Sequence, residues 1–175
     1  LKLRIPGWLR KGKVSVNGVV VAELDKKSAE SYFDVRVEDI ANTVVELDMD
    51  LTPRLTIAHT KVEEDLNQVA VERGPLGYCV ETMDSEAKDL GRIMIPVNAK
   101  FDESKMTIKG HELVTLETEG LTFEDDEWYD EDALYQTLDD AEVKPVKFRM
   151  IPYFAWDNRG MGEMIIWLPA FWGKY

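Results

Sequence analysis

The sequence predicts an all-β protein built as an antiparallel β-sandwich of the jelly-roll type. Short runs of apolar and β-branched residues recur roughly every 8–12 residues, with Gly, Pro or Asn between them, which is typical of sandwiches. Tight hairpin signals interrupt the same pattern, and helical periodicity is weak. The strands form either one sandwich, or one partial sandwich followed by one complete sandwich.

The expected strands follow one another from the first residue. Asn17-Gly18 predicts a tight hairpin, because both turn positions need a positive φ, and Lys109-Gly110 predicts another. Strands are expected at residues 1–5, 13–16, 19–22, 32–37, 43–49, 68–72, 77–81, 106–108, 113–116, 146–154 and 164–168. Short helical turns are expected only within 34–41, 84–90 and 130–138.

Two regions are expected, residues 1–64 and residues 65–175, because the polar stretch 60–67 separates them. The first region is small for an independent core. The chain also opens directly inside a strand, without an initiator Met. We therefore expect the first region to be the remnant of a larger middle domain, and the second to be a complete sandwich.

The net charge of −13 is concentrated in one segment. Residues 117–142 hold twelve acidic residues and no Lys or Arg, and the other 22 acidic residues are balanced by 21 Lys and Arg. Such a block is typical of a solvated insertion. Nucleic acid is disfavoured as a partner because the chain has no clustered basic face. No apolar run approaches the roughly 18–20 residues of a membrane span.

The acidic insertion also allows a metal-binding interpretation. Asp125, Asp126 and Asp130 are candidate Ca²⁺ ligands, since hard cations take several carboxylate oxygens. The spacing does not match an EF-hand loop, and the central Gly is absent. Adjacent carboxylates in a hydrated loop also lack the apolar surroundings that tune a glycosidase pair. We favour a solvated insertion, with no metal site and no catalytic residue assigned.

The single cysteine limits the available chemistry. Cys79 allows no disulfide within the chain and no Cys-rich zinc site, which needs about four Cys or His ligands. Its strand-like surroundings predict a small buried side chain rather than a reactive thiol. Phosphate-binding loops, His-Glu-x-x-His and Gly-x-Ser-x-Gly are absent from the sequence. We expect no cofactor in this chain.

The last thirty residues are rich in aromatic side chains. Aromatic residues in strands are usually core or interface residues, but exposed rings can also stack on sugars. The turn before Gly160 offers exposed polar groups beside such rings. The candidate carbohydrate contacts are Tyr153, Trp156, Asn158 and Arg159.

Three stretches of the sequence resemble one known family. They are Leu3-Arg4-Ile5-Pro6-Gly7-Trp8 with Val16-Asn17-Gly18, then residues 69–81 (VAVERGPLGYCVE), then residues 151–160 (IPYFAWDNRG) with Met164 and Trp167-Leu168-Pro169. In order and spacing they are similar to the sandwich region of the β-L-arabinofuranosidase family, glycoside hydrolase family 127. Residues 117–142 are not covered by the resemblance, and the sequence departs from the family around residues 40–42.

The resemblance implies a bacterial glycoside hydrolase whose catalytic part is an α/α barrel lying upstream of these residues. In that family the nucleophile is a zinc-bound cysteine held with two further Cys and one Glu. A chain with one cysteine cannot supply that cluster, so zinc is implied only for the catalytic domain. The resemblance also implies a periplasmic or secreted location.

Two functions remain open at this point. One is a non-catalytic accessory region that packs on the upstream catalytic barrel of the same protein or mediates homodimerisation. The other is a carbohydrate-binding module for arabinose-containing glycans. An exposed coplanar pair of aromatic rings would favour the module, and an apolar patch would favour docking.

Overall fold

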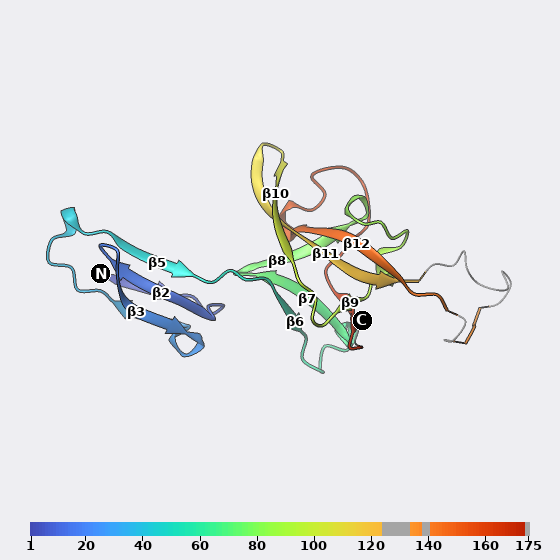
Figure 1. The fold of residues 1–175 in the computed structure, drawn as a ribbon, viewed down its shortest axis with the longest axis horizontal. Helices are drawn as coiled ribbons and strands as arrows, with labels where there is room; N and C mark the ends of the chain where they lie inside the picture. The colour runs from blue at the N-terminus through green and yellow to red at the C-terminus, as the bar shows by residue number, and fades with distance from the viewer. Residues whose placement is uncertain (124–133, 138–140, 174–175) are drawn as a thin grey trace. The chain divides into compact units, whose positions relative to one another are not determined.

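The computed structural model describes residues 1–123, 134–137 and 141–173, and they form two compact units, Leu1–Thr52 and Pro53–Tyr175 (Figure 1). We refer to these as the amino-terminal and carboxyl-terminal units. The described structure consists of strands joined by turns and short 3-10 helices, so the all-β prediction is confirmed.

The amino-terminal unit contains two small sheets. Its strands are β1 (Lys2–Ile5), β2 (Lys11–Val16), β3 (Val19–Asp25), β4 (Ser31–Asp34) and β5 (Val45–Met49). β1 pairs with β4, and the second sheet has the order β3-β2-β5. Asn17 and Gly18 have φ of 49° and 78°, so the predicted hairpin is confirmed. The buried core consists of Ile5, Leu9, Val14, Leu24 and Val35.

The carboxyl-terminal unit contains one large sheet. Its strands are β6 (Arg54–Ile57), β7 (Gln68–Arg73), β8 (Leu76–Glu81), β9 (Ile95–Pro96), β10 (Asp102–Ile108), β11 (His111–Thr122), β12 (Lys144–Pro152), β13 (Met164–Ile165) and β14 (Leu168–Phe171). The order is β10-β11-β12-β8-β7-β14-β9, with β13 on β8 and β6 on β7. The β14–β9 pair is parallel, whereas we expected antiparallel pairing throughout.

The large sheet curls round until the chain next to β9, at one end, contacts β11, the second strand from the other end. Met94, next to β9, bridges to Leu121 of β11 through two backbone hydrogen bonds of 2.8 and 2.9 Å. The curled sheet encloses the main core, which includes Tyr78, Ile95, Leu116, Phe148, Met150 and Leu168. Gly120 permits this closure, because a Cβ there would lie 2.6 Å from the Met94 carbonyl oxygen.

Several predicted elements differ from the structure. The strand expected at 32–37 ends at Asp34, and the strand expected at 146–154 ends at Pro152. A 3-10 helix, η8 (Tyr153–Ala155), follows Pro152 and takes the place of the last two residues of that expected strand. The described part of the expected helical regions holds only short 3-10 turns, namely η2 (Ile40–Asn42), η4 (Thr82–Asp84) and η5 (Leu90–Arg92). Two further 3-10 turns are η1 (Lys26–Ser28) and η3 (Glu63–Asp65).

The two units divide between Thr52 and Pro53, whereas we expected the boundary between residues 64 and 65. The reason is β6, a strand that the sequence pattern did not predict. Arg54 to Ile57 pair with Glu72 to Val69 of β7, so this segment is part of the carboxyl-terminal sheet. The polar stretch 60–67 is the loop of that hairpin rather than a linker.

The boundary that we expected for the acidic insertion, residue 117, lies within a strand. Residues 117–122 are the second half of β11, and they pair with residues 144–149 of β12. Negative charge alone therefore did not mark a loop. Asp125, Asp126 and Asp130 lie outside the described residues.

Candidate functional site

The segment that follows β12 presents three aromatic side chains to solvent. We call residues 153–160 the aromatic turn. Tyr153, Phe154 and Trp156 are 47%, 61% and 41% exposed, and Ala155 between them is buried. The chain reverses through Asp157 and Gly160, whose φ values are 61° and 142°. Left-handed backbone is accessible to Asp and favours Gly, so the sequence suits this turn.

A buried carboxylate at the end of β8 fixes the aromatic turn. Glu81 is buried, and its Oε1 accepts a hydrogen bond of 3.0 Å from the backbone N–H of Asp157. Its Oε2 accepts a hydrogen bond of 3.0 Å from Arg159 Nε. Burying a charge is costly unless it is paired and hydrogen-bonded. The interactions with Asp157 and Arg159 meet that requirement, so they tie the turn to the core sheet.

Arg159 joins two acidic groups rather than projecting into solvent. Besides Glu81, it donates to Asp84, with 3.0 Å between Arg159 Nη1 and Asp84 Oδ1. The side chains of Glu81 and Asp84 are almost fully buried. Hydrogen bonds to Asp84, and then to Glu81, raise the pKa of the guanidinium above its already high value. Arg159 therefore stays charged and holds the turn in place.

Asn158 closes the aromatic turn from within. Its Nδ2 donates to the carbonyl oxygens of Ala155, at 3.2 Å, and of Trp156, at 3.1 Å. These bonds satisfy backbone acceptors at the end of η8. The amide is thus engaged in shaping the turn.

The rings of Tyr153 and Trp156 are nearly parallel. Their centroids are 6.3 Å apart, and the planes differ by 8°. Residues three apart in a 3-10 helix lie on the same side, so Tyr153 and Trp156 share one side of the turn and Phe154 faces another. The two rings are stacked on each other, which differs from the coplanar pair that would favour a carbohydrate-binding module.

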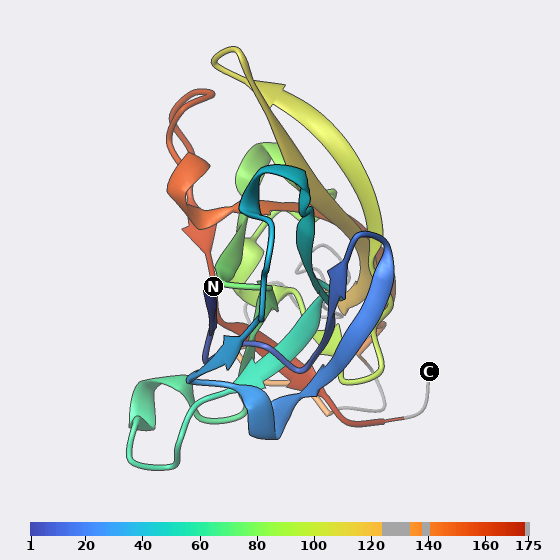
Figure 2. The same cartoon turned by 90° about the vertical axis from the view of Figure 1, so that its left-hand side faces the viewer.

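Phe154 lines a groove between the aromatic turn and the β10–β11 hairpin. We call it the hairpin groove; its volume is about 500 Å³. Figure 2 shows the hairpin and the turn projecting from the same end of the carboxyl-terminal unit. The lining residues are Ile108, Lys109, His111, Glu112 and Leu113 from the hairpin, and Phe154, Ala155 and Asn158 from the turn. Apolar and polar side chains thus meet in one depression.

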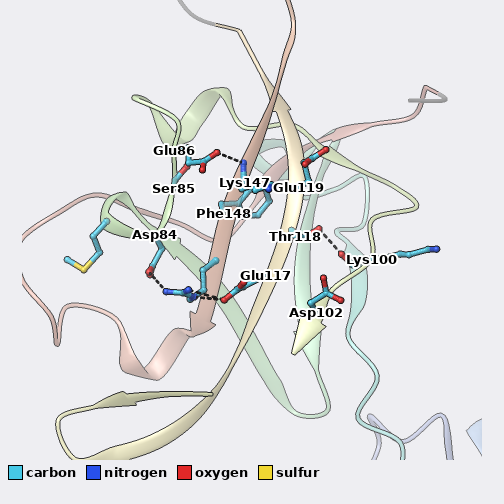
Figure 3. Close-up of a pocket in the computed structure, with 12 residues that line it drawn as sticks. Asp84, Ser85, Glu86, Lys100, Asp102, Glu117, Thr118, Glu119, Lys147 and Phe148 are labelled. Carbon is cyan, nitrogen blue, oxygen red and sulfur yellow. Dashed lines mark hydrogen bonds and ion pairs between the residues drawn. The ribbon is translucent and has the colours of Figure 1, made fainter. Parts of the chain in front are cut away.

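A second depression, of about 690 Å³, lies across β11 and β12 and is called the charged groove (Figure 3). Three of its charged side chains, Asp84, Glu117 and Arg149, form ion pairs with one another. Arg149 Nη2 lies 2.9 Å from Glu117 Oε1, and Arg149 Nη1 lies 3.9 Å from Asp84 Oδ1. The hydrogen bonds from Arg149 and Ser104 lower the pKa of the Glu117 carboxyl. Phe148, the aromatic residue among the side chains that line this groove, is buried.

Cys79 is not placed for nucleophilic chemistry. It is fully buried, and burial, together with the negative charge of Glu81, raises the pKa of its thiol to about 12. A thiol is nucleophilic as the thiolate, which this environment disfavours. Within residues 1–123, 134–137 and 141–173, no group of three or more His, Cys, Asp or Glu side chains is arranged to hold a metal ion.

The four predicted carbohydrate contacts come together in the aromatic turn, but they have different surroundings. Tyr153 and Trp156 are exposed, whereas Asn158 and Arg159 are engaged in hydrogen bonds that shape the turn. Glu81, Asp84 and Phe154, which complete the site, were not predicted from the sequence. The sequence did offer one signal for Glu81, since this acidic residue directly follows the apolar run 78–80. An acidic residue at the end of a buried strand is expected to need a charged partner, because carboxylates are rarely buried unpaired.

The amino-terminal unit has an exposed apolar edge on β3. Val19, Val20 and Val21 are 66%, 46% and 50% exposed, and β3 is an edge strand of its sheet. Val14 and Ser15 of β2 pair with Ala22 and Val20, which leaves Val21 as a bulge. We call residues 19–21 the valine edge. No helix in the described ranges is both long and apolar enough to cross a membrane.

The described residues thus form an all-β chain of two units, with Cys79 buried in the carboxyl-terminal one. The comparisons with known proteins identify the family. Residues 53–169 match the glycoside hydrolase family 127 C-terminal domain, and residues 1–51 match the GH127 middle domain of β-L-arabinofuranosidase. The chain therefore belongs to glycoside hydrolase family 127, as the sequence resemblance predicted.

Individual proteins are similar to the chain over nearly its whole length. A non-reducing end β-L-arabinofuranosidase of Bifidobacterium longum subsp. longum is 31% identical over 166 residues, which are 93% of this chain and 24% of that protein. A solved glycoside hydrolase is 40% identical, with a TM-score of 0.84, over 97% of this chain and 27% of that one. A GH127 β-L-arabinofuranosidase from Geobacillus stearothermophilus T6 is 30% identical, with a TM-score of 0.83, over 98% and 26%. The chain spans about a quarter of the length of these relatives.

Proposed function

We propose that this chain is a non-catalytic accessory region of a β-L-arabinofuranosidase-like glycoside hydrolase, and that it packs on an upstream α/α-barrel catalytic domain of the same protein. The observation that carries the proposal is the valine edge. Natural proteins protect exposed apolar edge strands, because such edges associate with other chains. Three consecutive exposed valines are thus best explained by a partner that covers them.

The nature of that partner follows from the length of the relatives. About three quarters of each relative lies outside the region that this chain matches. A catalytic domain in the same polypeptide would be present at high effective concentration, so a modest apolar surface suffices for docking. The bulge at Val21 distorts the free edge of β3, which disfavours strand addition. We therefore expect docking through side chains rather than through a continuous sheet.

The buried thiol supports a non-catalytic role. The zinc-bound cysteine of the family's catalytic centre would have to come from the barrel domain, since Cys79 is enclosed in the core. We therefore assign the zinc site to the proposed barrel domain.

The same substitution in two molecules tests the docking proposal. Val19→Asp is expected to leave the melting temperature of the 175-residue chain unchanged, because Val19 is exposed. In a longer polypeptide that includes the in-frame coding sequence upstream of Leu1, the same change is expected to lower the melting temperature, because it would bury an unpaired carboxylate. Met161→Asp, at a residue that is 98% exposed in the carboxyl-terminal unit, is the control. Equal, negligible effects of Val19→Asp in both molecules would contradict docking at the valine edge.

A further inference from the structure

We propose that the hairpin groove is a binding site for a neutral saccharide. This site is independent of docking at the valine edge, because the groove lies in the carboxyl-terminal unit and the valine edge lies in the amino-terminal unit. In this proposal most residues that contact the sugar differ from the four that the sequence suggested. Of those four, only Asn158 lines the groove.

The groove combines side chains of two kinds. Phe154 supplies an exposed aromatic ring, and Leu113 is a partly buried apolar side chain. Ile108 and Ala155, which also line the groove, are buried and form its apolar floor. A sugar ring presents C–H groups on its faces and hydroxyl groups around its rim. Its faces pack well against an aromatic ring, and its hydroxyls need hydrogen-bonding partners. An aromatic surface with polar groups around it therefore suits a sugar better than a purely apolar ligand.

Polar side chains also line the groove. They are Lys109, His111, Glu112 and Asn158, which together supply both donors and acceptors. The Glu112 carboxylate is already paired with Lys105, at 2.7 Å, so it can accept hydrogen bonds without needing a cationic ligand. These polar side chains favour an uncharged ligand with many hydroxyl groups.

The walls of the groove are held rigidly. Glu81 and Arg159 fix the aromatic turn to the core, and tight pairing through Ile108 and His111 fixes the hairpin. A preformed site loses less conformational entropy when a ligand binds. The volume of about 500 Å³ is within the roughly 300–1,000 Å³ of small-molecule sites.

The charged groove lacks these properties, although it is larger. Arg149 is paired with Glu117 and Asp84 there, and no exposed aromatic ring is among the described residues that line it. A sugar would have to compete with existing ion pairs without gaining a stacking surface. The hairpin groove therefore suits a saccharide better than the charged groove does.

The test is a titration of the 175-residue chain with saccharides, in which calorimetry and NMR chemical shifts measure binding. The probes are an arabinofuranosyl oligosaccharide and, as a pyranose, cellobiose. We expect saturable binding of at least one probe, with shifts confined to residues 108–113 and 154–158. Phe154→Ala is expected to weaken binding about tenfold or more, the size of effect seen when a central aromatic contact is truncated. Phe154→Tyr should retain binding.

Tyr32→Ala removes an aromatic residue that is 64% exposed in the other unit, and it should leave binding unchanged. Since Phe154 is also exposed, Phe154→Ala should keep the far-ultraviolet circular dichroism of the native chain. Absence of saturable binding of either probe at about 10 mM would overturn the proposal, because affinity below that range is too weak for a specific site. Undiminished binding by a folded Phe154→Ala chain would also overturn it.

Discussion

Arg159 and Glu81 lie 78 positions apart in the sequence and meet in an ion pair whose carboxylate is buried and whose Arg side chain is 16% exposed. The pair connects the aromatic turn to the end of β8. Arg159 also donates a hydrogen bond to Asp84, and Asp84 lies within ion-pair distance of Arg149 in the charged groove. The orientation of the exposed aromatic residues therefore depends on charges in the interior.

Glu81→Gln is expected to destabilise the chain by about 2–3 kcal/mol. The substitution keeps the shape of the side chain but removes a charged acceptor, and hydrogen bonds to charged groups contribute about 1.5–3 kcal/mol. Urea denaturation measures the change. Lys2→Ala is the control, because the Lys2–Asp34 pair is 72% exposed on both sides and should contribute little. Equal stability of both variants would contradict a structural role for the buried pair.

Trp156→Ala is expected to cost only about 1 kcal/mol. Trp156 is partly exposed, and the main loss is its contact with Tyr153, since such aromatic pairs contribute about 0.5–1.5 kcal/mol. Tyr78→Ala should cost about 3–5 kcal/mol, because Tyr78 is fully buried in the core. Thermal or chemical denaturation compares the two. A loss at Trp156 as large as that at Tyr78 would place Trp156 in the core instead.

Gly120→Ala tests the closure of the large sheet. An added Cβ would lie 2.6 Å from the Met94 carbonyl oxygen and 3.0 Å from Phe148. Overpacking of this kind typically costs about 1–3 kcal/mol. Gly77→Ala is a control in β8, another strand of the same sheet, because a Cβ added there would have no described neighbour within 4 Å. Similar denaturation midpoints for the two variants would show that the contact between Met94 and Leu121 does not close the sheet.

The buried thiol predicts a pH dependence in the alkaline range. Burial raises the pKa of Cys79 from 9.0 to about 12, so the folded state retains a proton that the unfolded state releases. Below pH 9 the thiol is protonated in both states. Between pH 9 and pH 12 the unfolded state releases the proton more readily, so the free energy of unfolding falls as the pH rises. Cys79→Ala should therefore show a shallower loss of stability over that range than the native chain. Identical slopes would indicate an exposed, ordinary thiol.

Much of the strand pattern could be predicted from local sequence. The hairpins at Asn17-Gly18 and Lys109-Gly110 carry their own turn signals, and both appear where expected. β6 was missed because its four residues follow Pro53 and have no tight-turn signal beside them. β6 forms because it pairs with β7 in the folded sheet, and such tertiary pairing is not visible in local sequence.

The aromatic turn shows why the candidate site was only partly predictable. The residue types Tyr153, Trp156, Asn158 and Arg159 were identified from the sequence, but their orientations were not. The interaction of Arg159 with Glu81 is non-local, and β12 ends at Pro152, two residues before the end of the expected strand. The hairpin groove requires residues 108–113 beside Phe154, and local patterns carry no information on that proximity.

Hydrolysis of an arabinofuranoside by the purified 175-residue chain, measured with and without added zinc, tests the non-catalytic assignment most directly. The buried, protonated thiol of Cys79 and the missing metal cluster among the described residues predict no turnover above background in either condition. Turnover that depends on zinc and disappears in Cys79→Ala would contradict the assignment.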